Sequence, residues 1–521
     1  MIWLVMVGLM LGLGWAVQKA SPEGGTSLWS YGDWMTASSM HDALGGRLHR
    51  GDQPVPVIQH GAWRLLLGVT GWHEAGPGMY RWSGWVGGML LLFLLLRWVM
   101  KLRPGDAWFG LFAGGYLVVA PPWLSLVGMG GSDLVTALLV VGACLLHLRR
   151  ASGPVPLSFG AAFLIGLLSA QRMEGLFLWL LMCLHGLITG AGEGRATRPA
   201  ILLRGVTGLA WVGVGIAPLV GWNVFSLGPL VPWPEFPGAP LGLSGFVGEG
   251  GAIGVYLHWL AASVPVAYGR FWSAPAIAGV IPFLLMCAAM GYWTVQLIRG
   301  ALPASCWFMP LTFFVLPGLV AMLLPVTGWN GVGMLADAVS LLWLPVLAWS
   351  AWDGTLLGLR RFSARIPPAA LTHARTLGLM TISLGLLVHG FSKSTGELQR
   401  MNREAADREW WRQAWPEQAG GGTVQVVATD RPEWFGVRDD VRVLDLTRET
   451  SPRLYAYPAF LSMTGEAWSR MVREREIEVV VLWSSAYRSH GQEALGLAPY
   501  TGDGEEPRGN IPLVARVSSR R

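Results

Sequence analysis

Asp33 is the acidic residue whose setting best suits chemistry. It follows the first long apolar segment, within YGDWM at 31–35, and stands just before a short amphipathic pattern. A carboxylate there could take a proton from a hydroxyl group as a general base. It could equally cap a helix, because aspartate side chains accept hydrogen bonds from the first free backbone N–H groups. Periodicity alone favours the cap, and the two roles are compatible.

Arg172 and Glu174 form a second candidate site, between short apolar segments at 157–170 and 174–190. An arginine beside apolar helices costs up to about 2.5–3.5 kcal/mol on insertion scales unless it has a partner. Glu174 could be that partner in a purely structural ion pair. A lipid phosphate is the other candidate, because the guanidinium fork matches phosphate oxygens. Residue chemistry leaves both alternatives open.

His60 and Asn330 are candidate substrate contacts. His60 lies in the first long polar segment with His41, and Asn330 precedes a late apolar segment that begins near Asp337. The spacing of the two histidines is not that of metal ligands. Carboxylates other than Asp33 are sparse among the apolar segments, so we expect no dedicated divalent-metal site and no required cofactor, and a single bound ion stays open.

These candidates lie in a chain too apolar for an ordinary soluble enzyme. Hydrophobic residues make up 52% of the 521 residues and charged residues only 13%, against about 25% charged in soluble proteins. Crossing the hydrocarbon core takes about 20 apolar residues, which leaves room for about eleven spans. The expected fold class is an α-helical polytopic membrane protein with a small C-terminal α/β extracytoplasmic domain.

Basic residues orient the spans. Lysine and arginine, among them Arg103, Arg149 and Arg299, concentrate at one set of span ends, which predicts that this set is cytoplasmic. The N-terminus is then cytoplasmic and the C-terminal domain extracytoplasmic. The net charge of +6 thus reflects topology, and no nucleic-acid partner is expected. The predicted spans are 2–16, 83–100, 107–127, 134–148, 157–170, 174–190, 203–224, 274–298, 305–326, 336–357 and 374–391.

The spans divide the chain into a transmembrane domain, a charged linker and a small α/β domain. The first outer loop carries an apolar stripe of Trp34, Ala37, Met40 and Leu44, which predicts a helix lying in the membrane interface. The α/β domain is expected to be loosely three-stranded. The boundaries are 1–391 with outer loops at 17–82 and 225–273, then 392–422, then 423–521, with strands at 424–428, 442–446 and 478–483 and a helix at 465–474.

This combination resembles the GT-C superfamily of integral-membrane glycosyltransferases. Asp33 stands where such enzymes have an acidic motif in the first outer loop. AQRMEGL at 170–176 is similar to their L-x-R-x-E-G-L stretch, with alanine in the leading position, and GPLVP at 228–232 is similar to their G-x-x-x-P loop. The chain departs from the pattern at Gly32, where relatives often have a second acid. It also departs at Asn330, where some relatives have a charged residue.

The resemblance implies an inverting glycosyltransferase of a bacterial inner membrane. The donor would be a polyprenyl-phosphate sugar, and the acceptor a glycan, lipid or protein on the extracytoplasmic face. Asp33 would act as base on the acceptor hydroxyl, and Arg172 would stabilise the departing lipid phosphate. Glu174 would orient Arg172 or contact the sugar. The sugar, the acceptor and the oligomeric state stay open.

Two other functions fit the sequence less well. A transporter or flippase usually has inverted repeats with broken helices in both halves, whereas the only polar interruption expected here is near Arg172. A catalytically silent relative that acts as an assembly subunit is the other alternative. The glycine at position 32, which breaks the acidic pair, favours that reading.

Overall fold

A computed structural model describes part of the 521-residue chain. They are 8, 31–46, 57, 60–75, 77–104, 106, 109–110, 112–114, 117, 131–151, 157–172, 175–191, 197–227, 276–316, 319, 338–339, 341–343, 345–354, 356–357, 425–431, 441–446, 457–458, 460–497 and 513–517.

The chain divides into two compact units, each described by itself. One unit contains Met1–Ser21, Tyr80–Ala217 and Pro240–Arg400. The other contains Pro22–Met79, Pro218–Ala239 and Met401–Arg521. Residues 22–79 of the predicted first outer loop and the predicted C-terminal domain at 423–521 therefore fall in the second unit.

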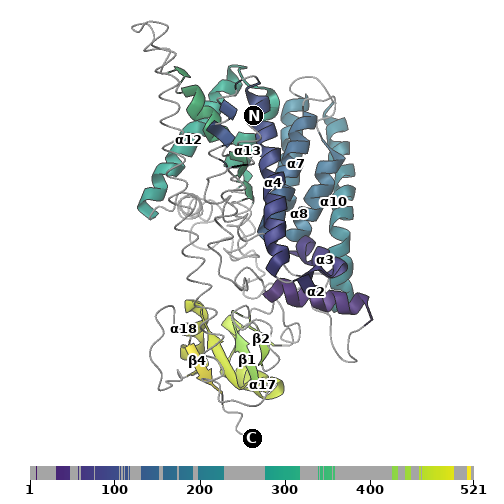
Figure 1. The fold of residues 1–521 in the computed structure, drawn as a ribbon, viewed down its shortest axis with the longest axis vertical. Helices are drawn as coiled ribbons and strands as arrows, with labels where there is room; N and C mark the ends of the chain where they lie inside the picture. Colours follow the sequence, from purple (N-terminus) through teal and green to yellow (C-terminus); the bar gives the residue numbers. More distant parts are fainter. Residues whose placement is uncertain are drawn as a thin grey trace. The chain divides into compact units, whose positions relative to one another are not determined.

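Among the described residues, three helices are long and apolar enough to cross a membrane. They are α4 (Pro77–Leu102), α7 (Gly131–Ala151) and α10 (Arg198–Leu227). Helices α4, α7, α8 and α10 run alongside one another (Figure 1). The predicted spans at 83–100, 134–148 and 203–224 are thus confirmed as helices, whereas 2–16 and 374–391 lie outside the described residues apart from Gly8.

Shorter apolar helices complete the described bundle. The predicted segment at 305–326 begins with a 3-10 turn and continues as a helix to Phe314, and residues 317–318 and 320–326 lie outside the described residues. The 336–357 segment is helical wherever it is described. The shorter helices are α8 (Phe159–Gln171), α9 (Gly175–Gly186) with a π-helical continuation η3 (Leu187–Ala191), α12 (Ala276–Ile298), η5 (Ala304–Trp307) and α13 (Phe308–Phe314).

Glycines let α8 and α10 approach each other closely. A Cβ atom added at Gly166 would lie 2.3 Å from the carbonyl oxygen of Val212 and 2.8 Å from the Cα of Gly215. Small residues at such crossings are typical of helix pairs in membranes, where close backbone packing replaces the hydrophobic effect as the source of association. The two glycines therefore fix the distance between these helices.

Helices α2 (Tyr31–Leu44) and α3 (Gly61–Thr70) pack against each other. Ala37 and Met40 of α2 are buried, and a Cβ atom at Gly68 of α3 would lie 2.7 Å from the Met40 sulfur. These two residues of the predicted apolar stripe are therefore buried within the protein, and the position of α2 in the membrane interface stays a prediction. The side chain of Trp34 lies outside the described residues.

The C-terminal domain contains a four-stranded mixed sheet in the order β2-β1-β3-β4 (Figure 1). Its strands are β1 (Gln425–Thr429), β2 (Val441–Asp445), β3 (Val479–Leu482) and β4 (Leu513–Arg516). The first three are parallel, and β4 pairs antiparallel with β3. The expected three strands are present, and the four-residue strand β4 was not predicted.

Helix α17 (Gly465–Arg475) leads into β3 as predicted, and α18 (Ser485–Glu493) follows it. The side chains of Trp468, Met471 and Val472 on α17 are buried in the main core of this domain. Asp430, at the carboxyl end of β1, accepts hydrogen bonds from the backbone N–H groups of Trp483 and Ser484, each at 2.8 Å. This carboxylate holds the turn between β3 and α18.

Candidate active site

Arg172 occupies the break between α8 and α9. Its backbone is extended, with φ −153° and ψ 119°, and its N–H donates to the carbonyl of Leu168 at 2.6 Å. Its own carbonyl accepts the N–H of Gly175 at 2.9 Å, and the side chain is 5% exposed. The predicted interruption between two short apolar helices is therefore confirmed, with the arginine buried at its centre.

Close packing at Gly175 and a hydrogen bond from Gln171 fix the break between α8 and α9. A Cβ atom at Gly175 would lie 2.8 Å from the Leu168 side chain and 3.1 Å from the Ser169 nitrogen, so only glycine fits the start of α9 without a shift. Gln171 donates from Nε2 to the carbonyl of Ser132 at 3.0 Å. This bond places the Arg172 turn at the N-terminal end of α7.

Asp133 lies in the first turn of that same helix, α7. A carboxylate at this position is stabilised by the partial positive charge of the helix N-terminus. Asp133 thus has a structural role near the Arg172 turn. Met173 and Glu174 lie outside the described residues, so the proposed pairing of Glu174 with Arg172 stays a prediction.

Asp33 lies in the first turn of α2, because the helix begins at Tyr31 and not after Asp33. The side chain of Asp33 lies outside the described residues. Asp33 belongs to one compact unit and Arg172 to the other, so their meeting in one site remains a prediction.

His60 immediately precedes α3 and has a left-handed backbone, with φ 58°. Its carbonyl accepts the N–H of Arg64 at 3.0 Å and so begins the helix. His60 and Asp33 are thus carried by two segments that pack together. Asn330, the other predicted substrate contact, lies outside the described residues.

Arg64 is a candidate that sequence reasoning missed. Its side chain is 1% exposed, on the helix that packs against the one carrying Asp33. A guanidinium buried this deeply requires acceptors or an anion nearby. The sequence offers no clear sign of its burial, because Arg64 stands among apolar residues without the polar interruption that marks Arg172.

Asn223 is a second residue that the sequence did not single out. Its side chain accepts the N–H of Val57 at 2.8 Å and donates to the carbonyl of Val57 at 2.9 Å. Both residues are fully buried. The amide therefore ties the segment before α3 to the end of α10, 166 residues away, and holds the outer loop that carries His60 and Arg64.

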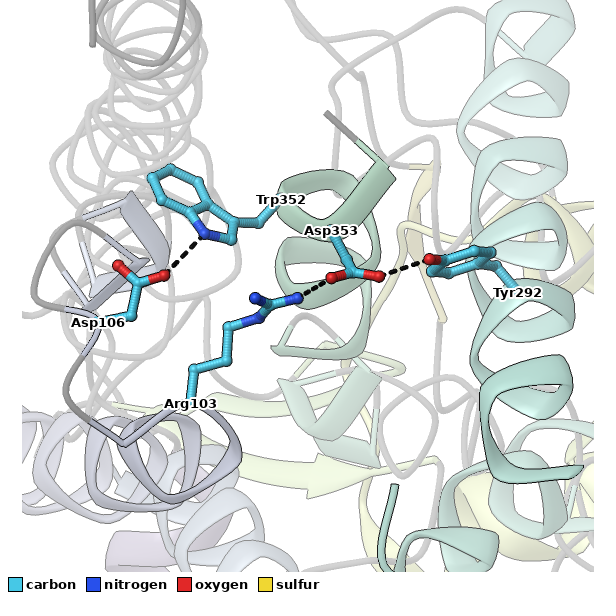
Figure 2. Close-up of polar contacts among 5 residues, drawn as sticks. All are labelled: Arg103, Asp106, Tyr292, Trp352 and Asp353. Atoms are coloured by element: carbon cyan, nitrogen blue, oxygen red, sulfur yellow. Dashed lines mark hydrogen bonds and ion pairs between the residues drawn. The ribbon is translucent and has the colours of Figure 1, made fainter. Parts of the chain in front are cut away.

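A further polar cluster joins the C-terminal ends of α4 and two later helices (Figure 2). Arg103 forms an ion pair with Asp353, and the hydroxyl of Tyr292 donates to the other oxygen of the same carboxylate. Asp106 accepts hydrogen bonds from Trp352 Nε1 and from the Phe109 N–H, both at 3.0 Å. Each of the four carboxylate oxygens of Asp106 and Asp353 accepts a hydrogen bond, so the cluster stabilises the packing of these helices.

Among the residues that the structure describes, no three histidine, cysteine, aspartate or glutamate side chains form a group that could hold a metal ion. The arrangement around Arg172 instead suits an anion, since a buried guanidinium binds phosphate oxygens well. Anion binding by Arg172 stays a prediction.

No protein-family model matches the sequence, and no curated protein matches it. Solved structures do match. ArnT from Cupriavidus metallidurans in the apo state is 13% identical, with a TM-score of 0.53 over 98% of this chain and 97% of ArnT. AglB from Archaeoglobus fulgidus, solved with an inhibitory peptide and a dolichol-phosphate, is 14% identical, with a TM-score of 0.51 over 92% of this chain and 69% of AglB.

These likenesses extend over nearly the whole chain, including the membrane helices and the small mixed sheet. At such low identity they bear on the fold alone. They confirm the fold that the resemblance implied: this chain has a GT-C-like fold similar to the folds of ArnT and AglB.

Proposed function

We propose that this chain is an inverting glycosyltransferase that moves a sugar from a polyprenyl-phosphate donor to an acceptor on the extracytoplasmic face of a bacterial inner membrane. The likeness to ArnT over 98% of the chain carries the proposal. The dolichol-phosphate in the AglB structure supports a lipid phosphate as the ligand class. The burial of Arg172 in an apolar bundle supports a site for such an anion.

In the proposed reaction, Asp33 takes the proton of the acceptor hydroxyl as the new bond to the anomeric carbon forms. Arg172 stabilises the negative charge that develops on the departing phosphate, and a partly dry cavity strengthens that interaction. Arg64 is a second buried cation suited to an anionic ligand, on the helix that packs against α2. Glu174, His60 and Asn330 would contact the sugar or orient these groups.

The test is transfer from a radiolabelled polyprenyl-phosphate sugar by purified protein, with extracted envelope glycans and lipids as acceptors. Asp33→Asn should lower the rate about 10²–10⁴-fold, because an amide cannot accept the proton. Asp42→Asn, in the same helix, is the matched control. Wild-type rates in Asp33→Asn would contradict the proposed base.

Ligand binding separates the phosphate site from the base. Arg172→Met and Arg64→Met should weaken binding of polyprenyl phosphate alone, whereas Asp33→Asn should leave that binding nearly unchanged. Tight binding by the wild type with no product over all acceptors would instead support the silent assembly subunit. Lipid flux across liposomes without covalent product would support the flippase.

A further inference from the structure

Two contacts hold Arg204 of α10 against the start of α8, the helix that runs beside it (Figure 1). Its Nε donates to the carbonyl of Leu157 at 3.1 Å, and its guanidinium carbon lies 4.1 Å from the centroid of the Phe159 ring. Among the described residues, the two terminal amino groups of Arg204 have no hydrogen-bond acceptor. The half-buried guanidinium is thus fixed in direction and keeps donors for a ligand.

Arg103 is stacked in the same way but has a partner that Arg204 lacks. The guanidinium carbon of Arg103 lies 5.0 Å from the ring centroid of Trp349, and its charge is paired with Asp353. No carboxylate in the described part of the chain pairs with Arg204. A guanidinium beside apolar helices is more stable with an anion nearby, so Arg204 favours an anionic partner from outside the chain.

The end of the bundle that carries Arg204 is basic. Helix α7 ends with the exposed Arg149 and Arg150, and the connection at 152–158 leads from there to the start of α8. Helix α10 begins at Arg198, also exposed. The sequences of α8 and α10 contain no aspartate or glutamate, and the one acid of α7, Asp133, lies in its first turn, at the other end. The charge of this end therefore complements an anion.

Exposed aromatic side chains continue from Arg204 along the contact between α8 and α10. Trp211 is 45% exposed, and its ring stacks on Phe159 with the centroids 6.1 Å apart. Phe163, one turn further along α8, is 36% exposed, and its carbonyl oxygen would lie 2.7 Å from a Cβ atom at Gly215 of α10. Because α10 is long and apolar enough to cross a membrane, these rings suit contact with a lipid acyl chain.

We propose that α8 and α10 bind one anionic phospholipid of the surrounding membrane at Arg204. The terminal amino groups of Arg204 donate to the headgroup phosphate, which matches the guanidinium fork, and an acyl chain lies over Phe163 and Trp211. Basic sites between membrane helices bind anionic headgroups in this way. The neighbouring arginines disfavour a zwitterionic lipid, because its ammonium group would meet like charge.

This site is separate from the proposed donor site at Arg172. Arg204 contacts the start of α8, whereas Arg172 follows its last residue, about 20 Å further along the helix axis. In the predicted topology the phospholipid belongs to the cytoplasmic leaflet. Its binding does not depend on the proposed transferase activity.

The experiment uses full-length protein purified in detergent and freed of copurified lipid. Native mass spectrometry measures its affinity for dioleoylphosphatidylglycerol and for dioleoylphosphatidylcholine. Arg204→Gln should weaken phosphatidylglycerol binding about five-fold and leave phosphatidylcholine binding unchanged. Arg299→Gln is the matched control, because it removes the same charge from an exposed position just after α12. Equal phosphatidylglycerol affinities in Arg204→Gln and the control would overturn the proposal.

A measurement on the wild type keeps the test independent of how well the variants fold. Phosphatidylglycerol should bind more tightly than phosphatidylcholine, and equal affinities for the two lipids would overturn the proposal. Arg172→Met separates this site from the donor site, since it should leave phosphatidylglycerol binding as in the wild type. A loss in Arg172→Met as large as that in Arg204→Gln would place the lipid at the helix break and contradict the assignment to Arg204.

Discussion

Arg103 and Asp353 are 250 residues apart in the sequence and form an ion pair whose side chains are only 20% and 22% exposed. Tyr292 donates to the second oxygen of the same carboxylate. One aspartate therefore joins the end of α4, the helix α12 and the helical segment 345–354 (Figure 2). In the predicted topology this junction lies on the cytoplasmic side, opposite the proposed site.

Replacing Asp353 with alanine should destabilise the bundle. The change removes both acceptors and leaves Arg103 mostly buried without its carboxylate, at a cost of about 1.5–3 kcal/mol for hydrogen bonds to a charged group. Thermal unfolding in detergent measures the effect. Arg97→Ala, at an exposed position of the same helix α4, should shift the midpoint much less, and equal shifts in the two variants would contradict this role of the ion pair.

Gly166→Ala should force α8 and α10 apart. The new methyl group would meet the backbone of α10 at 2.3 Å, and backbone cannot move aside as a flexible side chain can. Overpacking of this kind costs about 1–3 kcal/mol, measured as a lower unfolding midpoint. Gly213→Ala is the matched control, because a Cβ atom there has nothing within 4 Å. A Gly166→Ala variant as stable as that control would show that the helices pack differently.

Asn223→Ala should loosen the first outer loop. It removes both hydrogen bonds to the buried backbone of Val57, a loss of about 1–3 kcal/mol. Limited proteolysis should then cut the segment around Val57 faster than in the wild type. Ser226→Ala removes only a bond to the Trp222 carbonyl within the same helix and should leave the cleavage rate near that of the wild type. Equal rates in the two variants would argue against the Asn223 anchor.

Glu474 should make the C-terminal domain lose stability in acid. The Tyr457 hydroxyl and Arg470, whose Nε lies 2.8 Å from the carboxylate, hold the pKa of Glu474 below its ordinary value. The unfolded chain therefore binds this proton more readily than the folded one. The resulting stabilisation is present above the ordinary pKa and is lost as the pH falls through the lowered one.

Unfolding of the wild type and of Glu474→Gln, followed across this pH range, measures the effect. The wild type should be the more stable at neutral pH, and the difference should shrink once the pH falls below about 4.3, the ordinary glutamate value. Glu478→Gln, at an exposed position of the same domain, is the control. A difference that grows on acidification would have the wrong sign for this network.

Much of the fold follows from local pattern. The long apolar runs of α4, α7 and α10 each predict a helix, because a span must satisfy its backbone hydrogen bonds within itself. Helix α3 was not predicted, since its apolar residues point both ways: Trp63 and Leu67 are buried, whereas Leu66 and Val69 are exposed. The spacing of its apolar residues therefore does not indicate which side of the helix is buried.

The candidate site likewise combines one feature that the sequence predicts with others that it does not. The break at Arg172 was predictable, because the polar pair Gln171 and Arg172 between two apolar runs is a local signal in the sequence. The burial of Arg64 was not, since burial depends on which element packs over a residue. The same holds for Asn223, which finds its partner 166 residues away.

The sequence by itself determined that this is a multi-pass membrane protein, that its helices break at Arg172 and that its motifs resemble the GT-C superfamily. Only the tertiary structure decided that Ala37 and Met40 of α2 are buried where α2 packs against α3, that His41 meets His73 and that Arg103 pairs with Asp353. The reason is physical. Helix formation is governed by neighbours along the chain, whereas these contacts arise between segments that only folding brings together.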